Sequence, residues 1–274
     1  MCAAKVLFSL RVLKFWLSSP KITNVLKIGL IGGSGLEKLN IFRDSDEVNF
    51  TTPYGSPSST FFRGNTGKCE VYILSRHGRD HAIPPSHVNN KANIHALKEL
   101  GCTSIIATTA CGSLREEIRR GDIVFPDQFI DFTRHRVSTF FDTFSPGVLG
   151  HTAMPDPFSM HLRKLLTDTA TEMDLPFHRS GTLITIEGPR FSTRAESVMF
   201  RTWGADIINM SIAPEAALAN EAGIPYAVIA LSTDYDSWKQ DENPVTWEEV
   251  LKVFEENVRH VTGLLVRTLE KISR

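Results

Sequence analysis

Short, almost continuously apolar runs alternate with helical patterns from Leu26 to the end of the chain, and this alternation restricts the possible folds. The runs Leu26–Ile31, Thr103–Thr109 and Tyr226–Leu231 are rich in aliphatic and β-branched residues, which is typical of buried strands. Val88–Leu100, between two of them, has apolar residues at helical spacing. Because strands that are apolar throughout need cover on both faces, the pattern predicts an α/β domain with a central sheet covered by helices.

The remaining elements follow from the same patterns and from helix-end signals. Further strands are expected at Glu70–Ser75, Asp122–Phe125, Thr182–Ile186 and Asp206–Met210. Further helices are expected at Phe158–Met173 and Thr193–Trp203, from Pro214 to Gly223, and from Thr246 onward. Pro214 suits the first position of a helix, and Thr246 with Glu249 has the spacing of a capping box. No repeat or Ser/Gly linker divides this stretch, so residues 25–274 are expected to form one domain.

Composition argues against several other classes of protein. Of the 274 residues, 42% are hydrophobic and 22% are charged, as in an ordinary globular chain. No apolar run approaches the roughly 18 residues that span a bilayer, so no integral membrane contact is expected. The net charge of −1 argues against a nucleic-acid partner. Cys2, Cys69, Cys102 and Cys111 form no C-x-x-C pair, which favours a reducing compartment and predicts a cytoplasmic protein.

The N-terminal segment differs from the rest of the chain in charge. Residues 1–36 contain five basic residues and no acidic one. Arg11 and Lys14 interrupt the apolar stretch Val6–Leu17, unlike the h-region of a secretory signal. An amphipathic transit peptide or a membrane-surface helix would fit this pattern. We expect residues 1–24 to be a dispensable extension, or the result of a start assigned too far upstream, because the first convincing core element begins near Val25.

Candidate functional residues follow the expected strands. In open α/β sheets, ligands bind beyond the carboxyl ends of strands. The segments there are Gly32–Gly35, Ser75–Arg79, Thr108–Ser113, Glu187–Phe191, Asn209–Ser211 and Thr233–Asp236. Together they supply hydroxyls and Arg76 for an oxyanion, Phe191 as a flat face for a ring, and the carboxylates of Asp234 and Asp236 for proton transfer.

Each segment taken alone also has a plainer interpretation. Gly32–Gly35 fits neither a dinucleotide fingerprint nor a P-loop, so it can be a tight turn. Arginines after a strand can be solvated surface charge, and Asp234 and Asp236 would also suit a helix cap or a loop salt bridge. His77 and His81 are four residues apart but lack further ligands, so no metal is predicted. The ordered set is more specific than any one segment.

Eight motifs stand in the same order as in a known enzyme family. They are IGGSGL (31–36), TPYGSP (52–57), RHGR (76–79), TTACGSLREE (108–117), GDIVFPDQFID (121–131), TIEGPRFSTRAE (185–196), FRTWGADIINM (200–210) and TDYDSW (233–238). On these motifs the chain resembles the 5′-methylthioadenosine phosphorylases, within the trimeric purine nucleoside phosphorylase family, over residues 27–270. The resemblance implies a nucleoside phosphorylase-like fold, a homotrimer with sites between subunits, and inorganic phosphate as co-substrate without a metal or organic cofactor.

The resemblance also implies a reaction and a set of site residues. Phosphate would attack C1′ of methylthioadenosine and release adenine and 5-methylthioribose 1-phosphate, a step of purine and methionine salvage. The implied phosphate ligands are Ser34, Arg76, His77, Thr109, Ala110 and Ser211. Phe191 would face the purine and Met210 the ribose. Asp234 would serve purine N7 and Asp236 the exocyclic amine, and with Ser211 they form the expected catalytic set.

The 5′ pocket departs from the family pattern. By resemblance, it would contain His151 of a neighbouring subunit together with Val250 and Leu251. Longer relatives also close this pocket with a C-terminal tail, and Trp247 stands where they have a smaller apolar residue. We hypothesise that Trp247 compensates for the tail by packing on the methylthio group.

Several other functions remain open from the sequence. An adenosine phosphorylase would share this pattern, whereas a methylthioinosine phosphorylase would place the acceptor of a 6-oxopurine against Asp236. A hydrolytic nucleosidase would use water and would not need the anion-binding hydroxyls. A catalytically silent nucleoside-binding protein would bind the nucleoside without turnover. A nucleic-acid-binding role for the basic N-terminus lacks the aromatic residues interleaved with basic ones that such surfaces use.

Overall fold

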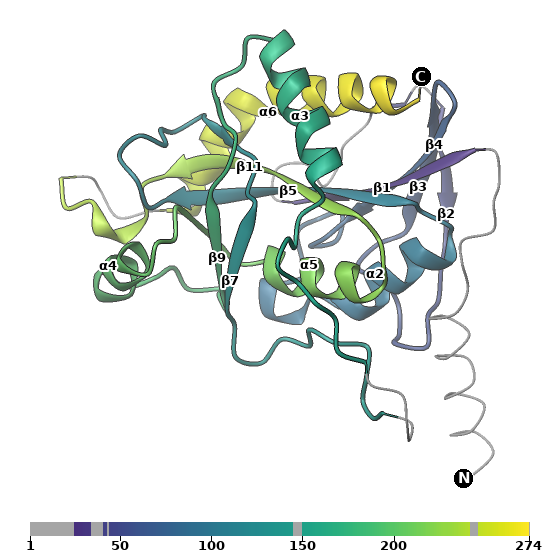
Figure 1. Cartoon of the computed structure of the whole chain (residues 1–274), viewed down its shortest axis with the longest axis horizontal. Helices are drawn as coiled ribbons and strands as arrows, with labels where there is room; N and C mark the ends of the chain where they lie inside the picture. The colour runs from purple at the N-terminus through teal and green to yellow at the C-terminus, as the bar shows by residue number, and fades with distance from the viewer. Residues whose placement is uncertain (1–24, 34–40, 43, 145–149, 242–245, 274) are drawn as a thin grey trace.

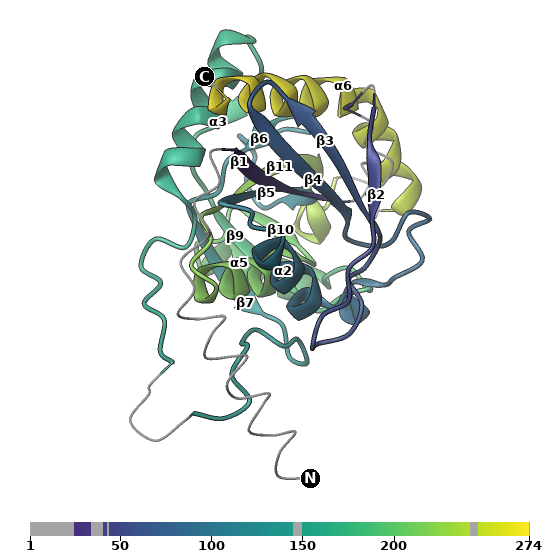
Figure 2. The ribbon, with the colours of Figure 1, turned by 90° about the vertical axis from the view of Figure 1, so that its right-hand side faces the viewer.

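The structure is a computed structural model that describes residues 25–33, 41–42, 44–144, 150–241 and 246–273. Within these ranges, one mixed sheet of eleven strands runs through the molecule, with helices on both of its faces (Figures 1 and 2). The predicted α/β domain with a helix-covered central sheet is therefore confirmed. No helix of the described ranges is both long and apolar enough to cross a membrane. Ser34 and the expected extension, residues 1–24, lie outside the described residues.

The sheet is built around one long central strand. The strands are β1 (Leu26–Gly32), β2 (Asp46–Val48), β3 (Phe61–Thr66), β4 (Cys69–Ser75), β5 (Ser104–Ser113), β6 (Ile123–Val124), β7 (Gln128–Phe132), β8 (Phe177–His178), β9 (Thr182–Ile186), β10 (Ile207–Asn209) and β11 (Tyr226–Asp234). Their order is β2-β3-β4-β1-β5-β10-β9-β7, and β11 pairs with β5 and β6. β5 runs parallel to β1 and β11 but antiparallel to β10. The carboxyl ends of two groups of strands therefore meet along the second half of β5.

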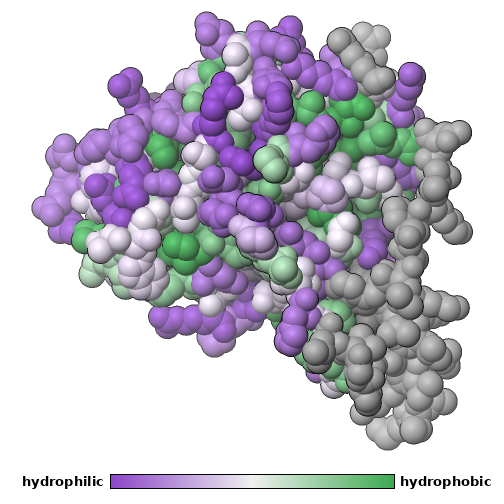
Figure 3. Space-filling model, in the orientation of Figure 1, coloured by the Kyte–Doolittle hydropathy of each residue, from purple (hydrophilic) through white to green (hydrophobic). Residues whose placement is uncertain are grey.

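Four of the described helices form two layers, each with its own hydrophobic core. The described helices are α2 (Asn90–Glu99), α3 (Met160–Glu172), α4 (Arg194–Thr202), α5 (Ile212–Glu221) and α6 (Trp247–Ile272), with short 3-10 turns at Pro85–His87 and Asp236–Trp238. α2 and α5 cover one face of the sheet, and their residues Leu97 and Leu218 belong to the core on that side (Figure 1). α3 and α6 cover the other face, and their residues Leu166 and Leu265 belong to a second core. Phe200 of the remaining helix, α4, joins a third, smaller cluster. On the side of the molecule that Figure 3 shows, exposed hydrophobic residues form separate areas among polar ones.

The predicted elements differ from the structure mainly at their ends and at the edges of the sheet. β5 and β11 extend to Ser113 and Asp234, beyond the expected ends at Thr109 and Leu231. The reason is that the two strands continue to pair with each other through residues that resemble a loop in composition. Strands β2, β3, β7 and β8 were not predicted. β2 and β7 lie at the ends of the strand order, and both carry exposed or half-buried residues throughout.

The starts of helices α6 and α5 can be compared with the predicted ones. Thr246 accepts a hydrogen bond from the backbone N–H of Glu249 at 3.3 Å, which is one of the two hydrogen bonds of the predicted capping box. Helix α5 begins at Ile212, two residues before the predicted start at Pro214. Pro214 is accommodated there because N–H groups in the first turn of a helix have no intrahelical partner.

Candidate active site

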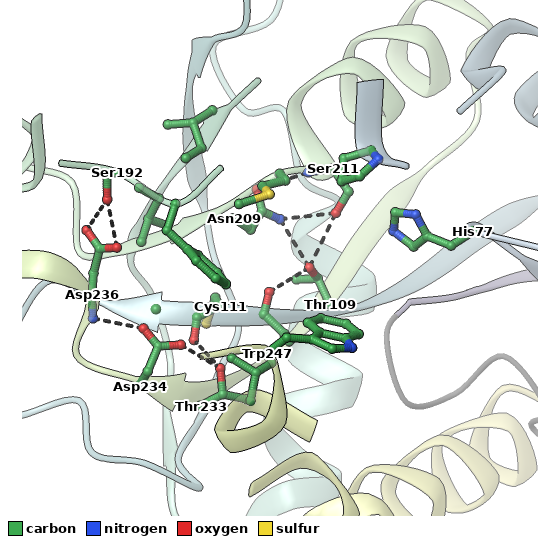
Figure 4. Close-up of a pocket in the computed structure, with 18 of the residues that line it drawn as sticks. His77, Thr109, Cys111, Ser192, Asn209, Ser211, Thr233, Asp234, Asp236 and Trp247 are labelled. Atoms are coloured by element: carbon green, nitrogen blue, oxygen red, sulfur yellow. Dashed lines mark hydrogen bonds between the residues drawn. The ribbon is translucent and has the colours of Figure 1, made fainter. Parts of the chain in front are cut away.

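A pocket opens where the two groups of strand ends meet (Figure 4). Its lining comes from the ends of β4, β9, β10 and β11, the second half of β5, and the start of α6. Gly112 of β5 lies opposite Ile208 of β10 in antiparallel register. Thr109 and Ser211, each three residues farther along this register, therefore come together. A Cβ at Gly112 would lie 2.8 Å from a carboxylate oxygen of Asp234. This close approach requires glycine at position 112.

One end of the pocket holds a cluster of hydroxyl and amide groups (Figure 4). Thr109 Oγ1 lies 3.3 Å from Ser211 Oγ, and Asn209 Nδ2 donates to Thr109 Oγ1 at 3.2 Å. Thr185 orients Asn209 by donating its hydroxyl to Asn209 Oδ1 at 2.8 Å. Ser211 is the N-cap residue of α5, but its side chain makes no capping hydrogen bond. Its hydroxyl instead contacts Thr109 and Asn209 at the pocket wall, and a hydroxyl that can rotate toward the pocket suits an oxyanion.

Arg76 lies at this same end and is 1% exposed. Its Nε and Nη2 donate to the two carboxylate oxygens of Glu215 at 2.5 and 2.9 Å, and its Nη1 donates to the carbonyl of Thr108 at 2.8 Å. Burial alone would lower the pKa of Arg76, but the Glu215 carboxylate raises it above its ordinary value. The guanidinium is therefore charged. A Cβ at Gly33 would lie 2.6 Å from Arg76 Nη1, so the backbone of Gly33 passes directly against the guanidinium.

The opposite end of the pocket holds two buried carboxyl groups (Figure 4). Asp234 accepts hydrogen bonds from the backbone N–H of Asp236 and from the hydroxyl of Thr233, both at 2.8 Å. Burial raises the pKa of Asp234 to about 6, so this carboxyl can hold a proton close to neutral pH. Asp236 accepts from the hydroxyl of Ser192, which lies 2.7 and 2.5 Å from its two oxygens. Burial raises the pKa of Asp236 as well.

Apolar side chains line the pocket between these two ends. Phe191 and Met210 contribute here. Gly188 has a φ of +64°, and a Cβ there would lie 2.5 Å from Met210 Sδ, so position 188 requires glycine on both counts. The side chain of Arg136 is 3% exposed and donates to Glu187 Oε1 at 2.8 Å, to the carbonyl of Met210 at 3.2 Å, and to the carbonyl of Glu187. This ion pair, in which Arg136 is buried and Glu187 half-buried, ties together the two strand ends that carry Phe191 and Met210.

Three neighbouring rings, of which His77 and His81 are stacked and Trp247 is tilted against His81, line one side of the pocket. The ring centroids of His77 and His81 are 4.6 Å apart, and those of His81 and Trp247 are 4.9 Å apart. His77 Nδ1 lies 2.8 Å from the carbonyl oxygen of Ile83; because a carbonyl only accepts, Nδ1 carries the proton. Trp247 is 39% exposed, and Val250, one turn farther along α6, also lines the pocket. The start of α6 thus closes one side of the pocket.

The structure brings most of the predicted site residues into this one pocket. Those that line it are Arg76, His77, Thr109, Ala110, Phe191, Met210, Ser211, Asp234, Asp236, Trp247 and Val250. Leu251 does not line it in the described chain, because neighbouring residues on a helix point about 100° apart and Val250 takes the inward position. His151 is exposed, contacts the ring of Phe144 and does not line this pocket.

Sequence reasoning assigned no role to several polar groups of the site. Ser192 stands beside the predicted motif residue Phe191 and contacts Asp236. Asn209 links Thr109 and Ser211. Glu215 is a single acid in the apolar stretch IAPEAALA, and this isolation was the only signal that it is buried. Among the described residues, no group of three or more His, Cys, Asp or Glu side chains is arranged to hold a metal ion.

Comparison with known proteins agrees with this arrangement. The sequence model of the Phosphorylase superfamily matches residues 27–270. The chain belongs to this superfamily. Among related phosphorylases, an S-methyl-5′-thioadenosine phosphorylase from Danio rerio is 50% identical over 250 residues, covering 90% of this chain and 89% of the relative. One from Xenopus tropicalis is also 50% identical, over 252 residues, with 90% and 89% covered.

Solved structures of the superfamily share the fold. Methylthioadenosine phosphorylase from Schistosoma mansoni in complex with adenine superposes with a TM-score of 0.86 at 41% identity, covering 90% of this chain and 92% of that one. A mutant of the adenosine/methylthioadenosine phosphorylase from the same organism, in complex with methylthioadenosine, superposes with a TM-score of 0.83 at 41% identity, with the same coverage. The expected nucleoside phosphorylase-like fold is therefore confirmed.

Proposed function

We propose that the chain catalyses phosphorolysis of 5′-methylthioadenosine to adenine and 5-methylthioribose 1-phosphate, in purine and methionine salvage. The observation that carries this proposal is the pairing, in one pocket, of an anion-binding cluster at Arg76, Thr109 and Ser211 with two buried carboxyl groups at the other end. The apolar wall between them fits a nucleoside that spans the two ends. The names of the relatives at 50% identity support the same substrate.

The anion-binding end would hold phosphate against C1′ of the nucleoside. Its proposed ligands are Ser34, Arg76, His77, Thr109, Ala110 and Ser211. In the reaction, a phosphate oxygen forms a bond to C1′ while the bond from C1′ to purine N9 breaks, and the electron pair of that bond leaves with the purine. The negative phosphate also stabilises the positive charge that develops on the ribose. Met210 would contact the ribose and Phe191 the purine.

The carboxyl end would stabilise the leaving purine. Asp234 would donate a proton to N7, which neutralises the charge that the base acquires. A positioned acid of this kind contributes about 10²–10⁴-fold to the rate, and a pKa of about 6 keeps a protonated fraction close to neutral pH. Asp236 would accept a hydrogen bond from the 6-amino group of adenine. A 6-oxopurine presents an acceptor at that position, so the site favours aminopurines over methylthioinosine.

The 5′ end of the nucleoside would lie against the side of the pocket that the three neighbouring rings line. We assign the methylthio group to a subsite formed by Trp247 and Val250, with Leu251 at its edge and His151 supplied by a neighbouring subunit. The exposure of His151 outside its own pocket supports this exchange. The proposed assembly is accordingly a homotrimer with sites between subunits, which sedimentation of the purified protein would test.

The remaining parts of the proposal concern the whole chain. The catalytic domain would span residues 25–274, with residues 1–24 as a dispensable extension, so a chain beginning at Val25 should retain full activity. Inorganic phosphate is the co-substrate and no metal or organic cofactor takes part, so a chelator should leave the rate unchanged. A cytoplasmic location fits the buried free thiols of Cys69, Cys102 and Cys111.

The deciding experiment is adenine release from methylthioadenosine with and without phosphate, beside the same assay with adenosine and methylthioinosine. Phosphate-dependent release that is strongest with methylthioadenosine is the expected result. Release without phosphate would instead identify a hydrolytic nucleosidase. Saturable binding without turnover would identify a silent nucleoside-binding protein, and equal rates with adenosine would leave the 5′ subsite without a role in specificity.

A further inference from the structure

A buried polar relay stands behind the pocket at its anion-binding end. Glu215 is 0% exposed, lies on α5 and does not line the pocket, yet both of its oxygens accept from the guanidinium of Arg76. Tyr226, at the start of β11 and 1% exposed, donates its hydroxyl to Glu215 Oε2 at 2.8 Å. The relay therefore joins the end of β4, the first turns of α5 and the beginning of β11.

This relay fixes the orientation of Arg76. A bidentate pair with a carboxylate allows the planar guanidinium essentially one orientation, and the bond from Nη1 to the carbonyl of Thr108 restrains the third nitrogen. Tyr226 in turn holds one of the Glu215 oxygens. Burial raises the pKa of the Tyr226 hydroxyl well above its ordinary value, so it is a hydrogen-bond donor throughout the working range of pH.

The ion pair also affects how the pocket can bind an anion. Because Glu215 neutralises Arg76, this end of the pocket offers directed N–H and O–H donors with little net positive charge. Binding that depends on directed donors is sensitive to orientation, whereas binding to an unpaired charge would tolerate displacement. The orientation that Glu215 imposes on Arg76 therefore matters to affinity for the anion.

We propose that Glu215 is a positioning residue that aims Arg76 at phosphate, and that Tyr226 supports Glu215 in that role. The proposal rests on the proposed function, because it takes phosphate as the anion. Its consequence is selective: loss of the relay weakens phosphate binding and leaves the purine end, on the far side of the pocket, unchanged. A residue needed only for folding would affect both ends together.

The test compares Glu215→Gln and Tyr226→Phe with a matched control, Glu221→Gln. Glu221 is also a buried acid of α5, but it accepts from the Thr139 hydroxyl at 2.7 Å and the Phe140 N–H at 2.5 Å and does not line the pocket. For each variant, the dissociation constants of inorganic phosphate and of adenine are measured by calorimetry. The KM for phosphate is measured in the adenine-release assay.

Glu215→Gln is expected to raise both the dissociation constant and the KM of phosphate by about 10- to 100-fold, since a hydrogen bond to a charged group contributes about 1.5–3 kcal/mol. Tyr226→Phe, which removes one neutral donor, should raise them about 2- to 10-fold. Adenine binding should stay within twofold of wild type. In the double variant, Tyr226→Phe should add little, because it acts through Glu215.

Three outcomes would overturn the proposal. One is a phosphate dissociation constant within twofold of wild type in Glu215→Gln; another is an equal loss of adenine binding; the third is the same phosphate defect in Glu221→Gln. If Glu215→Gln does not fold, the phosphate dissociation constant of Tyr226→Phe tests the proposal instead, because this variant leaves the ion pair in place. Phosphate binding is measured without turnover. A protein that binds phosphate but does not release adenine would contradict the proposed reaction and leave the proposed role of Glu215 testable.

Discussion

Replacing Asp234 by Asn is expected to stabilise the fold at pH 8, and the gain should shrink as the pH falls. Burial raises the pKa of Asp234 from an ordinary 3.8 to about 6. Above pH 6 the folded protein therefore carries a buried carboxylate that the unfolded chain would leave in water. The shift is about two pKa units, and at 1.36 kcal/mol per unit the carboxylate costs about 3 kcal/mol of folding free energy. Below pH 3.8 both states are protonated and the cost disappears.

Asn keeps most of the local hydrogen bonds. Its side-chain oxygen can still accept from the N–H of Asp236, and the hydroxyl of Thr233, which now donates to Asp234, can donate to the carbonyl of Cys111 at 3.2 Å. The substitution therefore removes the buried charge at small structural cost.

Urea unfolding at a fixed protein concentration measures the effect. The variant should gain about 3 kcal/mol at pH 8 and about half of that at pH 5. Asp168→Asn is the control, because the pKa of Asp168 is shifted in the opposite direction: its hydrogen bond with Lys164 lowers it. Replacing Asp168 by Asn should therefore bring no stabilisation at pH 8. A gain at Asp234 that is equal at both pH values, or a loss at pH 8, would refute the reasoning.

Three further predictions concern activity. At saturating phosphate, kcat/KM for methylthioadenosine should be constant below pH 6 and fall above it, as Asp234 loses its proton; a level profile up to pH 8 would contradict the role of Asp234 as an acid. Trp247→Ala should raise KM for methylthioadenosine about tenfold by removing apolar contact, with a much smaller effect on adenosine; equal effects on both would reject the methylthio contact. Gly33→Ala would place a Cβ 2.5 Å from the carbonyl oxygen of Thr108 and 2.6 Å from Arg76 Nη1. It should cost about 1–3 kcal/mol of stability in urea unfolding and raise KM for phosphate; unchanged values would show that the backbone there moves freely.

The strands that could be predicted from the sequence are those with a continuous run of apolar residues. β1, β4 and β9 are apolar over most of their length, and their predicted bounds agree with the structure within one residue. β2 and β7 were missed because most of their residues are exposed or half-buried, so neither shows a continuous apolar run. β5 was predicted too short for a different reason. Ala110 and Gly112 resemble a loop in composition, and only pairing with β11 and β10 keeps them in a strand.

The residues of the candidate site also fall into two groups, those that the sequence alone could identify and those whose partners are distant along the chain. Arg76 and Asp234 could be found because polar residues directly after a buried strand are conspicuous. Glu215 could not be assigned, since its partner Arg76 is 139 positions away along the chain and only the fold brings the two together. Arg136 is a similar case, because its contacts to Glu187 and Met210 lie 51 and 74 positions away.

These two distant ion pairs limit the positive charge that Arg76 and Arg136 bring to the pocket and to the strand ends beside it. An unpaired cation would favour the ionised form of a nearby carboxyl and lower its pKa. Glu215 neutralises Arg76, and Glu187 neutralises Arg136. At Asp234 burial has the largest effect and raises the pKa to about 6, although the cation of Arg120 acts to lower it. The Glu215 carboxylate thus leaves little net positive charge at the Arg76 end of the pocket, and burial lets the Asp234 carboxyl at the other end hold a proton close to neutral pH.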